Sequence, residues 1–111
     1  MSEKMSAAIL DRLMADIAEK AQSDPSESYT ASLIAAAPDK PLRKLSEEVT
    51  EALIEAMRGD SAALARESAD ILYHLLVVWQ AAGVKAENVW QILAERRGVS
   101  GLVEKANRTG Q

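Results

Sequence analysis

The feature that most constrains this chain is ESADILYHLLVVWQ, residues 67–80, which is apolar around most of a helical circumference and yet begins with two acids. At about 100° per residue, its charged and titratable groups fall on one narrow strip that holds Glu67, Asp70 and His74. A helix that is apolar nearly all round is normally buried. Because an isolated buried carboxylate is costly or takes up a proton, these two acids require a partner.

The rest of the chain predicts an all-α fold. Apolar residues recur at helical spacing, and no segment has the alternation of a strand. Gly59, Gly83 and Gly98 are expected to end helices, and Asp60 or Ser61 to cap the one that follows the first of these glycines. The helices are predicted over residues 4–22, 28–37, 40–58, from 60 or 61 to 83, 86–97 and 100–108.

Composition points to one helical domain over residues 1–111, small enough that a larger assembly would help to bury its apolar surface. Hydrophobic residues make up 48%, but aromatic residues make up 4% and Phe is absent, so the core must consist of Ala, Leu, Ile, Val and Met. That set favours helices over strands. The absence of Cys excludes disulfides and thiolate metal sites and favours a cytoplasmic location.

Charge and hydropathy exclude further classes of protein. The chain has 17 acidic and 13 basic residues, a net charge of −4, and no long run of Lys or Arg that would bind nucleic acid. No apolar run approaches the roughly 18 to 20 residues that span a bilayer, and acids and an arginine interrupt the apolar residues near the N-terminus. We therefore expect a soluble, unexported protein.

Two acidic pairs should meet across a helical hairpin. The short GDSAA connection makes residues 40–58 and 61–82 an antiparallel pair. If their apolar faces meet, Glu48 and Glu51 come opposite Glu67 and Asp70. Oxygen ligands of this kind suit Mg²⁺ or Mn²⁺. A solvated acidic face is the alternative for residues 47–55.

Other polar and aromatic residues have two interpretations each. His74 could donate a hydrogen bond to Asp70 or act as a titrating group beside it, but a partly buried packing role is favoured. Tyr73, Trp79 and Trp90 could stack on a base, although packing in the core or at a subunit interface is favoured. On the acidic arc of its helix, Lys44 lies between Glu47 and Glu51. Pairing with these acids and binding of a phosphate are equally plausible there.

The segments KLSEEVTEALIEAMRGD and LARESADILYHLLVVWQAAGV resemble phosphoribosyl-ATP pyrophosphatase, a family of the all-α nucleoside triphosphate pyrophosphatase superfamily. The resemblance extends from about residue 28 to residue 97, roughly two thirds of the chain. SYTASL and ADILYHLLV are similar to the phosphoribosyl-ATP branch in particular. The superfamily hallmark, EExxE followed by ExxD, is matched by Glu47, Glu48, Glu51, Glu67 and Asp70.

The resemblance implies a role for each of these acids. Glu48, Glu51, Glu67 and Asp70 would bind Mg²⁺, with Mn²⁺ as a substitute. Glu47, which would orient or deprotonate water, and Glu51 are the catalytic candidates. The candidates for holding the substrate phosphates are Lys40, Arg43 and Lys44. The resemblance does not decide whether Lys105 and Arg108 contact the substrate.

The implied reaction is Mg²⁺-dependent hydrolysis of phosphoribosyl-ATP to phosphoribosyl-AMP and pyrophosphate, the second step of histidine biosynthesis. The resemblance also implies a homodimer that completes the helical bundle. Two alternatives remain: a housecleaning (deoxy)nucleoside triphosphate pyrophosphatase of the same superfamily, and a non-enzymatic helical interaction module.

Overall fold

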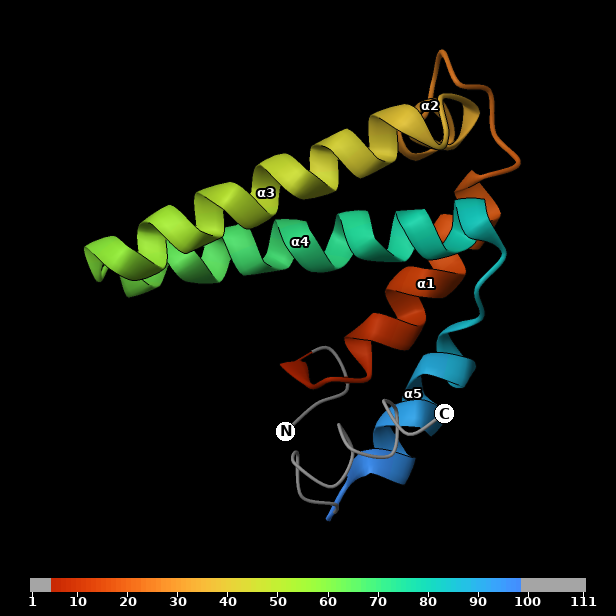
Figure 1. Ribbon diagram of the computed structural model, residues 1–111. Coiled ribbons are helices and arrows are strands. Elements are labelled where there is room, and N and C mark those ends of the chain that lie inside the picture. Colours follow the sequence, from red (N-terminus) through yellow and green to blue (C-terminus); the bar gives the residue numbers. More distant parts are fainter. Residues whose placement is uncertain (1–4, 99–111) are drawn as a thin grey trace, which may run out of the picture.

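The computed structural model describes residues 5–98, which form five helices and no strand (Figure 1). The prediction of an all-α fold is confirmed. The helices are α1 Ile9–Lys20, α2 Tyr29–Ala35, α3 Asp39–Arg58, α4 Ser61–Ala82 and α5 Ala86–Arg96. The expected helix over residues 100–108 lies outside the described residues. None of the helices within residues 5–98 has the length and hydropathy needed to cross a membrane.

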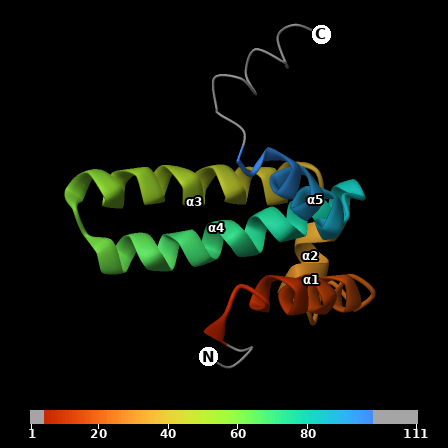
Figure 2. The same cartoon turned by 90° about the horizontal axis from the view of Figure 1, so that it is seen from below.

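The two longest helices, α3 and α4, form the predicted antiparallel hairpin (Figures 1 and 2). Gly59 ends α3 with φ of 75°, a left-handed conformation that residues with a Cβ rarely adopt. Asp60 caps α4, because its Oδ1 accepts a 3.0 Å hydrogen bond from the backbone N–H of Ala63. Of the two residues that the sequence offered as the cap, Asp60 is therefore the one used.

The hydrophobic core lies where α1 and α2 pack against the second half of α4. Its fully buried members are Ile17, Leu33, Leu76 and Val77. Figure 1 shows α1 crossing α4 near the end from which the chain leaves toward α5. The connected ends of α3 and α4 extend away from α1 and α2 (Figure 2).

Helix α5 lies against α1 and α4 without burying any of its own residues. Its Trp90 ring meets Trp79 of α4 edge to face at 5.8 Å between centroids. The indole N–H of Trp90 also donates a 2.9 Å hydrogen bond to Oδ1 of Asp11 in α1. The packing role expected for these two tryptophans is confirmed.

Burial differs from the expectation in two places. Helix α1 begins at Ile9 rather than near residue 4, and Met5 is 74% exposed. The apolar circumference of α4 is incompletely covered, since Leu72 is 41% exposed. Helix α4 packs mainly against α3, α1 and α2, and these contacts leave Leu72 partly uncovered among the described residues.

Replacing Asp60 by Ala should lower the free energy of unfolding by about 1 kcal/mol, because the N–H of Ala63 loses its acceptor. Replacing Asp60 by Asn should preserve most of the stability, since Asn caps helices about as well as Asp. Denaturant unfolding of the two variants beside the wild type tests this. Equal stability of all three proteins would show that the cap contributes nothing.

Candidate metal site

Three carboxylates meet in the middle of the hairpin. Glu48 comes from α3, and Glu67 and Asp70 come from successive turns of α4. One oxygen atom of each lies within 4.8 Å of one oxygen of the other two. Glu48 and Glu67 are half-buried and Asp70 is exposed, so the group opens to solvent on one side. Three of the four acids that were expected to meet across the hairpin therefore lie together, and Glu51 is outside this group.

Glu51 joins the group through Glu67. A hydrogen bond between the two side chains and the negative charge of Glu67 raise the pKa of Glu51 above its ordinary value. Burial and the charges of Glu47 and Asp70 add to this effect. A raised pKa means that the folded protein favours the protonated carboxyl. The acids therefore repel one another unless a proton or a cation lies between them.

Glu67 is the most constrained of these acids. A hydrogen bond with Glu48 and its own burial raise the pKa of Glu67 above its ordinary value, while its contact with Glu51 works in the opposite direction. Its Oε2 is buried and has no hydrogen-bond partner among the described atoms. A buried acceptor without a donor costs free energy unless a ligand satisfies it. A hard divalent cation fits this set of oxygens.

The other residues expected to act at the site lie on α3 beside the three acids. Glu47 is not one of the three acids whose oxygens lie within 4.8 Å of one another. Its Oε2 lies 3.8 Å from the ammonium of Lys44. Of the two roles considered for Lys44, pairing with an acid and binding a phosphate, the first is therefore observed, with Glu47. The ammonium of Lys40 lies 6.0 Å from the centroid of the Tyr29 ring, and Arg43 is exposed.

His74 is buried directly behind Asp70. Its Nδ1 lies 2.9 Å from the backbone oxygen of Asp70, and this contact makes Nδ1–H the donor because a carbonyl oxygen can only accept. The packing role favoured for His74 is confirmed by its 7% exposure. The other ring nitrogen, Nε2, is buried and has no partner among the described atoms.

A hollow next to His74 contains Tyr73, for which the sequence left base stacking open, and residues of the SYTASL segment, which it did not assign to a site. It has a volume of about 510 Å³. The signal that could have found it is the three-residue spacing from Asp70 to Tyr73, which places both on neighbouring turns of α4. The lining residues are Lys20, Ser23, Glu27, Ser28, Tyr29, Thr30 and Tyr73.

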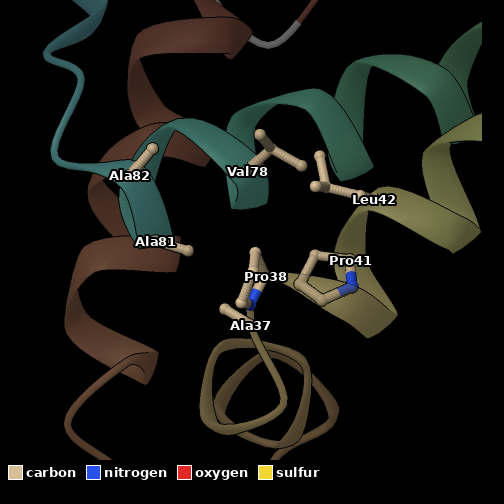
Figure 3. Close-up of a pocket in the computed structure, with 7 residues that line it drawn as sticks. All are labelled: Ala37, Pro38, Pro41, Leu42, Val78, Ala81 and Ala82. Carbon is tan, nitrogen blue, oxygen red and sulfur yellow. The ribbon is translucent and has the colours of Figure 1, made fainter.

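A second hollow, of about 280 Å³, lies at the corner between α2 and α3 and beside the end of α4 (Figure 3). Its walls are entirely apolar, and Figure 3 shows Pro38 and Pro41 facing Val78 and Ala81 across it. With no carboxylate or basic group in its lining, this hollow does not offer ligands to a cation or a phosphate.

Comparisons with known proteins agree on one family. The model of the family described as phosphoribosyl-ATP pyrophosphohydrolase matches residues 10–97. A phosphoribosyl-ATP pyrophosphatase of Azospirillum brasilense is 50% identical over 106 residues, which are 96% of this chain and 96% of that protein. One of Methylobacterium nodulans is 50% identical over 99 residues, which cover 89% of this chain and 90% of the relative. One of Cereibacter sphaeroides is 48% identical over 100 residues, which cover 90% of this chain and 97% of the relative.

Replacing Glu67 by Gln should abolish most of the stabilisation that a divalent cation gives. In wild type, we expect added Mg²⁺ or Mn²⁺ to raise the melting temperature, since a ligand that binds the folded state stabilises it. In chelator, the variant should melt at or above the wild-type temperature, because one of several repelling charges is gone. Thermal melts with each cation and with chelator measure both effects.

Glu55→Gln is the matched control, because Glu55 lies on the same helix but pairs with Arg58, at 3.8 Å, instead of with the acidic group. This variant should keep the full response to the cation. A wild-type melting temperature that is indifferent to both cation and chelator would contradict the metal site.

Proposed function

We propose, because the chain belongs to the phosphoribosyl-ATP pyrophosphohydrolase family, that residues 1–111 form one enzyme domain that hydrolyses phosphoribosyl-ATP to phosphoribosyl-AMP and pyrophosphate. This reaction is the second step of histidine biosynthesis. The observation that carries the proposal is the meeting of Glu48, Glu67 and Asp70 across the hairpin, in a chain that is 50% identical to a phosphoribosyl-ATP pyrophosphatase along 96% of its length. A cytoplasmic location follows from this role.

Glu48, Glu51, Glu67 and Asp70 are the residues that would hold Mg²⁺, or Mn²⁺ in its place. The three-acid group and the unpartnered Oε2 of Glu67 support this choice, and Glu51 lies next to Glu67. When bound, the ion would neutralise phosphate oxygens and lower the pKa of a water molecule. The four carboxylates supply hard oxygen ligands on a rigid pair of helices.

Glu47 would orient or deprotonate the attacking water. Its Oε2 lies 3.8 Å from the Lys44 ammonium. Lys40, Arg43 and Lys44 precede the acids on α3, and Lys40 and Lys44 are separated by one helical turn. These three cations would bind the phosphate chain, since phosphoryl transfer depends mainly on positioning and charge neutralisation.

A second copy of the chain is the proposed partner that covers the exposed apolar side of the hairpin. Large apolar residues of α3 and α4 are 39% to 91% exposed, more than an isolated domain normally leaves in one region. Leu42 connects them to the apolar hollow of Figure 3. The exposed residues are Leu42, Val49, Leu53, Ile54, Met57 and Leu72. The negative net charge disfavours nucleic acid as a partner.

Pyrophosphate release from phosphoribosyl-ATP should depend on Mg²⁺ and disappear in chelator. Glu67→Gln and Asp70→Asn should each lower turnover by at least about 100-fold while retaining helical circular dichroism, because a lost ligand costs more than the roughly 10- to 100-fold typical of outer-shell changes. Glu55→Gln should stay within about twofold of wild type, since it leaves the acidic group intact.

A panel of ordinary and deoxynucleoside triphosphates, assayed beside phosphoribosyl-ATP, separates the alternatives. Preference for another nucleotide would keep the carboxylate chemistry and replace the substrate with that of a housecleaning pyrophosphatase. Failure to hydrolyse any nucleotide would leave the helical interaction module as the better description. Full activity of both acidic-group variants would contradict the assignment of the site.

Replacing Leu53 by Asp should convert a dimer into a monomer, because it places a charge on a side chain that is 62% exposed on the uncovered face. Sedimentation at micromolar concentration measures the change, with wild type expected to sediment as a dimer. Glu95→Asp, on the exposed side of α5, serves as the control and should remain dimeric. A monomeric wild type would contradict the proposed partner.

A further inference from the structure

The hollow of about 510 Å³ has the size and the mixed lining of a small-molecule site. Three elements build it: the end of α1 with Lys20, the segment that leads into α2, and Tyr73 of α4. None of the acidic-group residues lines it. It is therefore a separate set of side chains that the proposed chemistry leaves without a role.

The hollow and the acidic group share consecutive turns of one helix. Tyr73 and His74 follow Asp70 by three and four residues, which corresponds to about 5 or 6 Å along the helix axis. His74 joins the two regions, because it contacts the backbone oxygen of Asp70 and its ring meets that of Tyr73 edge to face at 5.0 Å. A ligand with its phosphates at the acids can extend from there toward the hollow.

Two tyrosines form aromatic walls in the hollow. The rings of Tyr29 and Tyr73 are nearly parallel, with 16° between their planes and 6.5 Å between their centroids. The hydroxyls of Thr30 and Tyr73 share a hydrogen bond, which fixes the Tyr73 ring. Tyr29 is 52% exposed, and the ammonium of Lys40 lies 6.0 Å from its ring centroid. Aromatic faces of this kind bind the planar surface of a nucleobase.

The polar groups of the hollow match a sugar phosphate. Lys20 supplies a cation. Ser23 and Ser28 supply hydroxyl groups that can donate hydrogen bonds to phosphate oxygens. Glu27 also lines the hollow, and its carboxylate would repel a phosphate but accept hydrogen bonds from ribose hydroxyls. His74, whose ring meets that of Tyr73 edge to face, adds a buried Nε2 that has no partner among the described atoms.

We propose that this hollow is the subsite for the nucleoside end of phosphoribosyl-ATP, and that Lys20 binds the phosphate of its phosphoribosyl group. This inference rests on the function proposed above. Phosphoribosyl-ATP differs from ATP by that group alone, so a cation placed beyond the base distinguishes the two molecules. The acids on the hairpin bind the end of the substrate that both molecules share.

Lys20→Gln should raise KM for phosphoribosyl-ATP about tenfold and leave kcat within about twofold, because a charge-assisted contact away from the reacting phosphates is lost. Product inhibition locates the contact. Inhibition by phosphoribosyl-AMP, which retains the phosphoribosyl group, should weaken about tenfold, whereas inhibition by pyrophosphate should be unchanged. Lys85→Gln, at an exposed lysine outside this hollow, is the matched control and should behave as wild type.

Tyr29 provides an independent test of the aromatic wall. Tyr29→Phe keeps the ring and should retain KM within about twofold, and Tyr29→Ala should raise it by about tenfold. Circular dichroism and melting temperature confirm that each variant is folded.

The outcomes separate this inference from the proposed function. If wild type hydrolyses phosphoribosyl-ATP but Lys20→Gln leaves KM and both inhibition constants unchanged, the subsite is wrong and the function stands. Weaker inhibition by pyrophosphate alone would move Lys20 to the triphosphate end and also overturn the subsite. A wild-type protein that does not hydrolyse phosphoribosyl-ATP would overturn the function and the subsite together.

Discussion

The meeting of like-charged carboxylates inside a helical hairpin is the constraint on which the rest of this structure depends. Glu48 and Glu67 approach from opposite helices, and the pKa of Glu67 is raised by their hydrogen bond and by burial. Ala52 on α3 and Ala63 on α4 are small buried residues, of the kind that allows two helices to pack closely. The hairpin therefore holds a repulsive arrangement that either a proton or a cation can relieve, and the second possibility is the property expected of a metal site.

The hairpin and its acids were predictable because the signals are local. A glycine followed by a capping acid at residues 59 and 60 fixes where one helix ends and the next begins. Carboxylates three residues apart must share a helix face whatever the rest of the fold does. One antiparallel connection then suffices to bring Glu48, Glu67 and Asp70 together. The local sequence did not decide between Asp60 and Ser61 as the cap, because both side chains can accept the same hydrogen bond.

Contacts between distant segments were beyond sequence reasoning. The bond from Thr30 to Tyr73 joins residues that are 43 positions apart, and the one from Trp90 to Asp11 joins residues that are 79 positions apart. No periodic pattern reports such a pair. The exposed side of α4 at Leu72 was missed for a related reason, since an apolar circumference indicates that a helix will be covered but not whether its own chain supplies the cover.

Chemistry and substrate selection can be assigned to different parts of α4. The acidic group meets requirements that every nucleoside triphosphate shares, because hard oxygens and a divalent cation act on the phosphates and not on the base. Selection must then come from side chains beyond the reach of those phosphates, and the hollow between Lys20 and Tyr73 is where the described residues offer both a cation and aromatic faces. His74 contacts both regions. Because Asp70 of the acidic group and Tyr73 of the hollow lie on consecutive turns of one helix, a substrate that fills the hollow has its phosphates placed in register with the acids, and a shorter nucleotide lacks that anchor.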